Sequence, residues 1–503
     1  MLISMIVLTI VVLLIVLLML RMPVALSLAL SGALGLGILQ GTNYATNVLG
    51  SVPFTATASF SLTIIPMFIL MGMLAMRARI AEHVFAIANH VVSRFPGGLG
   101  VATVMACAGF SAVSGSSIGT AATMSKLSVG QMRAYGYPAA LATGIVAIAG
   151  TLGVVIPPST FLVLYAIMTG ESVAQILAAG IIPGILSALG YIVYILVVGH
   201  RQIVRPETTL PEVVSVAHAD AAVRAGSREA AATGATSGAG SAGSGSGSGS
   251  GSFGAAPATV LPNTPNTTAV KQAYGRTVRN LPWRGLFRLG IIFLIILGGM
   301  FSGVFTSTES AAIAAFVALL ILLWEFRRDG WNTMWFNVKG ALLDTAQTTS
   351  MVFMILVGSS VFSTFLIAAH VPDTVTTWVA GLDIPPLLTI GLLLLLLLPL
   401  GTALDEISVL IITIPIIYPI AMELGFDGIW LGLMIVKLTA IGMVTPPVGM
   451  TCFVVSGTTG VPTETVFKGV LPLMLMDLAV SAVLFFVPAI TLFLPSLVAQ
   501  SAG

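Results

Sequence analysis

The residues best suited to chemistry in this chain lie in two short stretches, each with adjacent prolines inside long apolar sequence. The first is Thr151-Leu-Gly-Val-Val-Ile-Pro-Pro-Ser159 and the second is Gly442-Met-Val-Thr-Pro-Pro-Val-Gly449. Proline has no backbone N–H and its ring clashes with the preceding turn, so a helix breaks at each pair. In lipid, the freed backbone groups persist only where protein buries them or where they line a wet cavity. Two breaks in corresponding places are typical of the binding site of a secondary transporter.

The composition indicates a protein that crosses a membrane many times. Of the 503 residues, 57% are hydrophobic and only 8% are charged. Apolar runs of about 20 residues, the length that spans a bilayer, recur along the chain. The net charge is +2, and no basic face suggests nucleic acid as a partner. The chain also lacks a Gly-x-x-x-x-Gly-Lys-Ser/Thr loop, which argues against ATP as the direct energy source.

An internal repeat relates the two halves of the chain. Aligning Pro157 with Pro446 gives an offset of 446 − 157 = 289 residues. The same offset, kept without gaps, pairs Gly153 with Gly442 and also superimposes two interruptions of apolar segments, Ser114–Ser117 and Ala403–Glu406. We therefore predict two copies of one fold, each with a re-entrant hairpin and a broken helix.

The expected elements follow from the apolar runs. We predict a first repeat over residues 1–199, a disordered Gly/Ser-rich linker over residues 200–285 and a second repeat over residues 286–503. Gly41–Ser59 is interpreted as an uncharged polar loop, and Ala81–Arg94 as an amphipathic segment along the interface. The predicted spans and hairpin segments are Leu2–Leu20, Met22–Leu39, Ser61–Met76, Gly98–Met124, the span with the first double proline, Val173–Val198, Leu286–Gly303, Ala311–Trp324, Thr345–Ala369, Leu387–Leu400, Ile429–Val455 and Val470–Leu494.

Charge placement predicts the orientation of these segments, because basic residues concentrate on the cytoplasmic side. Those of the first half share one face if the N-terminus is outside and the first hairpin enters from inside: Arg21, Arg77, Arg79, Arg94, Lys126, Arg133, Arg201 and Arg205. Each repeat then has five full spans, an odd number, so the second repeat is inverted. Its hairpin enters from outside, near Asp373, Asp383, Glu423 and Asp427, and the C-terminus is also outside.

Hairpins that enter from opposite faces bring their tips together at mid-depth, beside the two broken helices. Helix N-termini there offer free N–H groups and positive dipole ends to an anion. Unwound stretches and helix C-termini offer carbonyl oxygens to a hard cation such as sodium. Hydroxyl oxygens add to these ligands from Ser114, Ser116, Ser117, Thr151, Thr402 and Thr445.

Three charged residues lie deep in the apolar sequence. A carboxylate at the bilayer centre costs on the order of 3 kcal/mol, so it normally has a functional partner. Asp405 is a candidate sodium ligand or an acceptor that stabilises the hairpin tip. Glu406 either belongs to this deep site or reaches toward the interface. Lys437 either pairs with an acid, extends its amine to the interface, or contacts substrate directly.

Several of these stretches together resemble a known family. They are Gly109-Phe-Ser-Ala-Val-Ser-Gly-Ser-Ser117, Gly150-Thr-Leu-Gly-Val-Val-Ile-Pro-Pro-Ser159, Ala179-Gly-Ile-Ile-Pro-Gly184, Phe305-Thr-Ser-Thr-Glu-Ser-Ala311, Leu404-Asp405 followed by Pro415 and Pro419, and Ile441-Gly-Met-Val-Thr-Pro-Pro-Val-Gly449. The chain resembles the large membrane subunit of tripartite ATP-independent periplasmic (TRAP) transporters over nearly its whole length apart from the linker.

The resemblance implies an all-α polytopic protein of the elevator-type ion transporter superfamily, located in a bacterial inner membrane. It implies uptake of organic acids, C4-dicarboxylates or acidic sugars, with sodium as the coupling ion and no other cofactor. The implied partners are a small four-helix membrane subunit and a periplasmic solute-binding protein. Substrate contacts would fall on Ser116, Ser117, Pro157, Pro158, Ser159, Thr445, Pro446 and Pro447. Sodium contacts would fall on Ser114, Ser117, Thr151, Gly153, Thr402, Asp405, Gly442 and Thr445.

Two other classes of function stay open at this point. The same repeat could form a passive channel or an exporter for small anions, which would need no delivery protein. An intramembrane hydrolase is disfavoured, because the five histidines lie in predicted interface or linker sequence and none is placed to act as a base.

Overall fold

The structure is a computed structural model, and it describes residues 2–20, 22–92, 97–203, 283–371, 374 and 385–502. Residues Met1–Ile203 and Asn280–Gly503 group into one compact unit. Most of the predicted linker 200–285, namely residues 204–282 with Arg205, lies outside the described residues, as do Arg21, Arg94, Asp373 and Asp383. The described residues are helices and their connections, and eight of these helices are long and apolar enough to cross a membrane.

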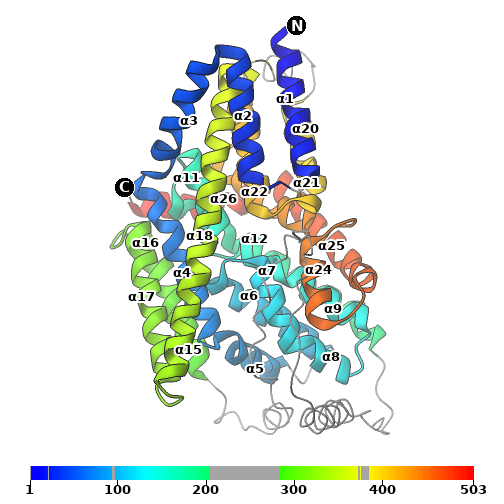
Figure 1. The fold of residues 1–503 in the computed structure, drawn as a ribbon. Coiled ribbons are helices and arrows are strands. Elements are labelled where there is room, and N and C mark those ends of the chain that lie inside the picture. Colours follow the sequence, from blue (N-terminus) through cyan, green and yellow to red (C-terminus); the bar gives the residue numbers. More distant parts are fainter. Residues whose placement is uncertain are drawn as a thin grey trace, which may run out of the picture. The chain divides into compact units, whose positions relative to one another are not determined.

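The first half of the chain supplies the helices up to residue 202. They are α1 Leu2–Met19, α2 Val24–Gln40, α3 Thr42–Thr57, η1 Phe60–Thr63, α4 Ile64–Arg77, α5 Ile80–Val92, α6 Gly98–Ser114, α7 Ser117–Met124, the π-helical turn η2 Ser125–Val129, α8 Gly130–Ala134, α9 Ala139–Gly150, α10 Leu152–Val155, α11 Thr160–Thr169, α12 Val173–Val197 and η3 Gly199–Gln202. Figure 1 shows their arrangement.

The second half reproduces this order. It contains α15 Trp283–Phe293, η5 Leu294–Gly298, α16 Gly299–Phe301, α17 Ser307–Phe326, α18 Trp331–Ala368, α20 Pro386–Leu395, α21 Leu397–Ala403, α22 Glu406–Glu423, α23 Gly428–Gly442, α24 Met450–Thr459, α25 Thr463–Phe486 and α26 Pro488–Ala502. Helix α9 begins at Ala139 and α23 at Gly428, and 428 − 139 = 289. The predicted repeat is thus confirmed at the level of helix boundaries.

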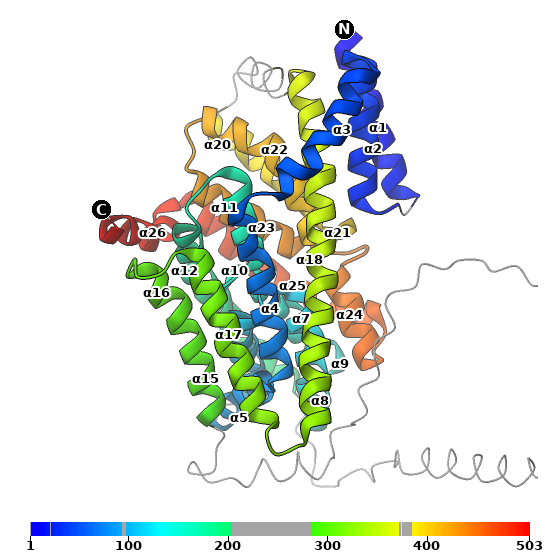
Figure 2. The same ribbon diagram turned by 60° about the vertical axis from the view of Figure 1, so that its left-hand side comes forward.

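The two repeats contact each other reciprocally. Helix α2 packs on α18, and α17, which is the counterpart of α2 in the second repeat, packs on α4. In the same way, α7 packs on α24 and α11 packs on α22. In Figure 1, α2 lies alongside α18, and Figure 2 shows α17 alongside α4. Reciprocal contacts of this kind are what a two-fold axis generates. They agree with the two-fold relation that the predicted inversion requires.

Two expectations from the sequence need correction. The polar stretch Gly41–Ser59 is not a loop, because residues 42–57 form α3. Its hydroxyls bond to its own carbonyls, as Ser51 Oγ does to Asn47 O at 2.8 Å, and the helix packs on α2 and α18. These hydrogen bonds satisfy the polar side chains within the helix, so a helix forms here although its sequence is not apolar enough to look like a span. In addition, the predicted span Thr345–Ala369 is the end of α18, a single helix of 38 residues that stands where the first repeat has α3, η1 and α4.

The broken helices occupy the interior. Every residue of α23 is buried, and so is every residue of α9 from Leu141 to Gly150. A helix that is apolar on all sides needs such surroundings. Burial by protein is one of the two conditions under which a helix can break at membrane depth, and a wet cavity is the other.

Two glycines allow α9 and α25 to cross with their backbones in contact. A Cβ atom on Gly469 would lie 1.8 Å from the carbonyl oxygen of Ala140, and one on Gly144 would lie 2.3 Å from the carbonyl carbon of Gly469. Small residues permit this close approach of membrane helices.

We predict that Gly469→Ala destabilises the protein by about 1–3 kcal/mol, because the added methyl group forces the two helices apart. Gly457→Ala, in α24, is the matched control, since a Cβ atom at Gly457 meets nothing within 4 Å. The measurement is thermal unfolding of the purified protein in detergent. Equal melting temperatures for the two variants would contradict this account of the crossing.

Candidate functional site

The helix break in the first repeat lies between α10 and α11. Residues Ile156–Ser159 leave the helix, and α11 resumes at Thr160 with Ser159 as its N-cap. The Ser159 hydroxyl accepts from Leu162 N at 3.3 Å and donates to Val154 O at 2.5 Å. One serine therefore satisfies a backbone group on each side of the unwound stretch, which stabilises the predicted break.

The tip of the first hairpin covers this break. Helix α6 ends at Ser114, and its C-cap Gly115 has a φ of 58°, in the left-handed region. Ser116 caps α7 by accepting from Gly119 N at 3.3 Å. A Cβ atom on Gly153 would lie 2.6 Å from Ser116 O, so the tip and the broken helix are in direct backbone contact. The structure thus brings together the segments Ser114–Ser117 and Thr151–Gly153 that carry the first predicted cation site.

The second repeat makes the equivalent arrangement with different residues. Helix α23 ends at Gly442, and α22 begins at Glu406 with Asp405 as its N-cap. The Asp405 carboxylate accepts from Ser408 N at 3.2 Å and also from the Ser408 hydroxyl. A Cβ atom on Gly442 would lie 2.8 Å from the Cα of Gly401. Asp405 therefore acts as the tip-stabilising acceptor that the sequence suggested, beside the second break.

The predicted hydroxyl ligands bond mostly within their own segments. Thr151 Oγ1 donates to Ile148 O at 2.6 Å, Thr402 Oγ1 to Pro399 O at 2.8 Å and Thr445 Oγ1 to Ile441 O at 2.7 Å. The hydroxyls of Ser114 and Thr120 bond to each other at 2.7 Å. A hydroxyl that donates its hydrogen keeps its lone pairs, so these oxygens fit the needs of a cation. Their role as sodium ligands stays a prediction.

The two double prolines differ in their surroundings. Pro157 and Pro158 are buried, whereas Pro446 and Pro447 are exposed. The peptide bond between the two prolines is cis in both repeats. Equivalent segments of one repeated fold thus lie in unequal environments, one inside the protein and one at its surface.

The hairpin tips meet at residues that the repeat makes equivalent. The Ser117 hydroxyl donates to Glu406 Oε1, and these residues are 289 apart, the offset of the repeat. Equivalent residues contact each other only at a two-fold axis, so this hydrogen bond marks the axis. Both are the first residues of their helices, α7 and α22. The N-termini of the two tip helices therefore converge on one point.

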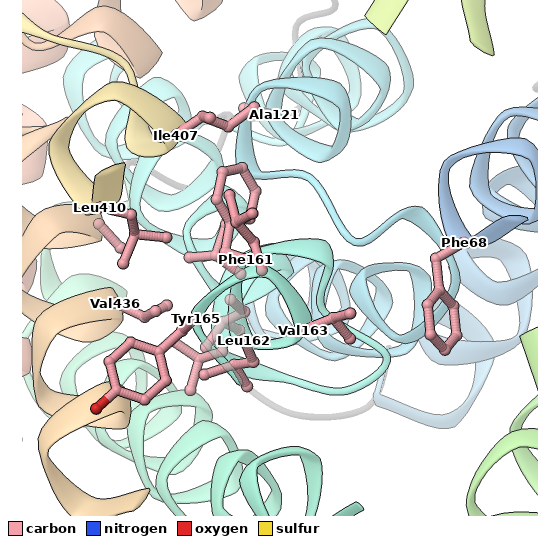
Figure 3. Close-up of a cluster of buried hydrophobic side chains, with 14 of the residues drawn as sticks. Phe68, Ala121, Phe161, Leu162, Val163, Tyr165, Ile407, Leu410 and Val436 are labelled. Carbon is pink, nitrogen blue, oxygen red and sulfur yellow. The ribbon is translucent and has the colours of Figure 1, made fainter. Parts of the chain in front are cut away.

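Glu406 lies deep in the protein and does not reach toward the interface. It is 5% exposed and packs among Val154, Phe161, Leu410, Val436 and Thr439. Figure 3 shows the Phe161 ring directed toward Ala121 and Ile407, with Leu410 and Val436 beside it. The sequence leaves open whether Glu406 belongs to the deep site. Its alignment with Ser117 at the repeat offset is the sequence signal that distinguishes the two alternatives.

Lys437 pairs with an acid, as one of its interpretations predicted. Its amine lies 2.7 Å from Asp477 Oδ1 and 2.7 Å from Ser187 Oγ, and the Lys437 and Asp477 side chains are 1% and 3% exposed. Removing one partner of such a pair leaves an uncompensated buried charge. The contact ties α23 to α25 and α12 behind the second break.

Comparisons with known proteins agree on one kind of molecule. Residues 11–490 match the family model described as "Tripartite ATP-independent periplasmic transporter, DctM component". The C4-dicarboxylate TRAP transporter large permease protein DctM of Pseudomonas aeruginosa is 31% identical over 448 residues, which covers 89% of each chain. The sialic acid TRAP transporter large permease protein SiaM of Vibrio cholerae is 29% identical, covering 91% of this chain and 90% of that one. These relatives are permease subunits of transporters and not enzymes.

A solved structure supports the fold independently of sequence. The Alcanivorax borkumensis YdaH transporter superimposes with a TM-score of 0.53 at 15% identity, covering 89% of this chain and 88% of that chain. At this identity the likeness concerns the fold alone.

Proposed function

Because the chain belongs to the family of large permease components of tripartite ATP-independent periplasmic transporters, we propose that it imports an organic acid with sodium as the coupling ion. Relatives are named for C4-dicarboxylates, for sialic acid, for 2,3-diketo-L-gulonate in Escherichia coli and for isethionate in Oleidesulfovibrio alaskensis. All of these are organic anions and most carry a carboxylate, and the substrate class proposed for this chain is a C4-dicarboxylate or an acidic sugar.

The observation that supports anion transport most strongly is the convergence of two helix N-termini at the hairpin tips. Ser117 and Glu406 begin α7 and α22 and are in contact. The N-terminus of a helix carries roughly half a positive elementary charge and offers N–H groups without helical partners. A carboxylate between the tips would receive hydrogen bonds from Ser116, Ser117 and the neighbouring backbone, which makes this point the proposed substrate site.

The proposed sodium sites lie at the two places where a tip meets a broken helix. Each combines hydroxyl oxygens with unwound backbone, the ligands that a hard monovalent cation takes. Binding of the cation would draw the tip onto the break and shape the anion site beside it. Binding of sodium and binding of the organic anion would then be coupled because both contact the same hairpin tip.

The unequal environments of the two double prolines support alternating access. If the repeats exchange conformations, Pro157 and Pro158 become exposed while Pro446 and Pro447 become buried. We propose that the hairpins and broken helices move as one unit against a scaffold that includes α2, α4, α17 and α18. The contacts α2–α18 and α4–α17 join the two repeats within this scaffold.

The proposed setting is a bacterial inner membrane with both termini in the periplasm and the linker in the cytoplasm. A small four-helix membrane subunit and a periplasmic solute-binding protein complete the proposed transporter. Large apolar side chains on α17 and α18 are exposed, including Trp324, Trp331 and Trp335. Aromatic side chains of this kind suit lipid or the small subunit.

The proposal is tested by uptake into proteoliposomes that contain this chain with its small subunit. Labelled succinate or sialic acid is supplied on its cognate binding protein, with and without an inward sodium gradient. We expect saturable uptake that requires both the gradient and the binding protein. Uptake that persists without either would favour a passive channel for small anions.

Asp405→Asn should raise the sodium concentration for half-maximal uptake by about tenfold, which corresponds to 1.4 kcal/mol of binding free energy. Asparagine caps a helix as well as aspartate does, so α22 keeps its N-cap while the site loses a charge. Ser408→Ala is the control, since it removes the hydroxyl that donates to Asp405 and retains the carboxylate. Unchanged sodium activation in Asp405→Asn would remove this residue from the cation site.

A further inference from the structure

Glu406 is a buried acid without a basic partner among the residues that the structure describes. The buried cation nearest to it along the chain is Lys437, and Lys437 is already engaged by Asp477 and Ser187. The carboxyl of Glu406 instead accepts a hydrogen bond from Ser117. It packs among the apolar side chains of Val154, Phe161, Leu410 and Val436. A structural ion pair therefore does not explain its position.

Glu406 presents a carboxyl group to Ser117, and an organic acid substrate would present the same group. Ser117 is the first residue of α7, where the positive end of the helix dipole favours an anionic oxygen. In this arrangement of the tips, the Ser117 hydroxyl already donates its hydrogen bond to Glu406. A substrate carboxylate can accept from that hydroxyl only by displacing the Glu406 carboxyl. The two carboxyl groups are competitors for one donor.

A second hydroxyl in the same group of side chains has no acceptor. Thr439 is 1% exposed and belongs to the group that packs around Glu406, and its Oγ1 has no hydrogen-bond partner among the described residues. Buried hydroxyls normally find a partner. A carboxylate has two oxygens, so a substrate carboxylate that bridged Ser117 and Thr439 would satisfy both hydroxyls, while Glu406 satisfies only one of them.

We propose that the Glu406 side chain is a built-in substitute for the substrate carboxylate. When no substrate lies between the tips, Glu406 accepts from Ser117 and allows the two tips to close on each other. When substrate enters, its carboxylate takes Ser117 and Thr439 and displaces Glu406. This inference rests on the proposed anion site at the tips and identifies the group that the anion replaces.

The proposal has a consequence for the transport cycle. A carrier that returns without substrate must close its tips, and without Glu406 that closure would bury an unpaired Ser117 hydroxyl. Closure with substrate does not need Glu406. Loss of the Glu406 carboxyl should therefore slow net uptake, because net uptake includes the return of the empty carrier. It should spare the exchange of substrate for substrate, because that exchange has no empty return step.

The variant that isolates this role is Glu406→Met, which keeps the volume of the side chain and removes the acceptor. Glu406→Gln is the matched control, because its amide oxygen can still accept from Ser117. The first measurement needs no transport: hydrogen exchange of the amides of residues 114–124 in purified protein without any organic acid. We expect protection to fall about tenfold in Glu406→Met and to stay within about twofold of wild type in Glu406→Gln.

Transport by the same proteins gives the second measurement, with labelled succinate and sialic acid as the two probes. Glu406→Met should lower net sodium-driven uptake and the KM while leaving counterflow exchange near the wild-type rate. Glu406→Gln should keep the wild-type ratio of net uptake to exchange. If Glu406→Met fails to fold, Glu406→Asp, which shortens the carboxyl by one methylene, replaces it and should shift both readouts in the same direction.

Unchanged hydrogen exchange in the Met or Asp variant would overturn the proposal, as would a Gln variant that behaves like Met. An equal loss of net uptake and of substrate-for-substrate exchange would also overturn the proposal. The exchange of amide hydrogens does not depend on transport, and wild type and variants are compared at one fixed sodium concentration. A wild-type protein that shows no sodium-driven uptake would therefore contradict the proposed function and leave the test of Glu406 intact.

Discussion

Backbone groups that leave a helix inside a membrane need partners, and this requirement organises the described part of the chain. Each repeat breaks a helix at a double proline and packs its own hairpin against the segment that leads into the break. Glycines make this contact possible, because Gly153 lies against the Ser116 carbonyl and Gly442 against Gly401. The first break is buried, and the helix that leads into the second break, α23, is buried along its whole length. The second break itself is exposed at Pro446 and Pro447.

The two-fold relation adds a second constraint, since it forces equivalent residues to face each other at the axis. In an identical pair of repeats, Ser117 would meet another serine. Here it meets Glu406, so the axis carries a carboxyl from one repeat and a hydroxyl from the other. The two repeats differ in sequence at this position, and the difference places a hydrogen-bond donor opposite an acceptor. The same asymmetry extends to the double prolines, which are buried in one repeat and exposed in the other.

Much of this architecture could be predicted from the sequence, because prolines and glycines constrain the backbone locally. The offset of 289 residues placed both hairpins and both breaks, and helices α9 and α23 begin at matching residues. Helix α3 was missed because its hydroxyls bond within the helix, which hydropathy does not register. The continuity of α18 was missed for a related reason, since its first half is too polar to look like a span. The depth of Glu406 and the exposure of Pro446 depend on tertiary packing, which a local pattern does not contain. The assignments of individual sodium and substrate ligands remain predictions.

The central claim is that equivalent segments of the two repeats exchange environments during transport. Ser159 and Val448 test it directly, because they are 448 − 159 = 289 residues apart and are 0% and 41% exposed. Single cysteines at these positions can be labelled with a hydrophilic thiol reagent, against a background from the buried Cys107 and Cys452. We predict that Val448→Cys is labelled fast and that Ser159→Cys is protected. When sodium and a transported organic acid are added, the labelling rate of Ser159→Cys should rise relative to that of Val448→Cys. Equal labelling of both cysteines, or a ratio that never responds to sodium and substrate, would contradict the account.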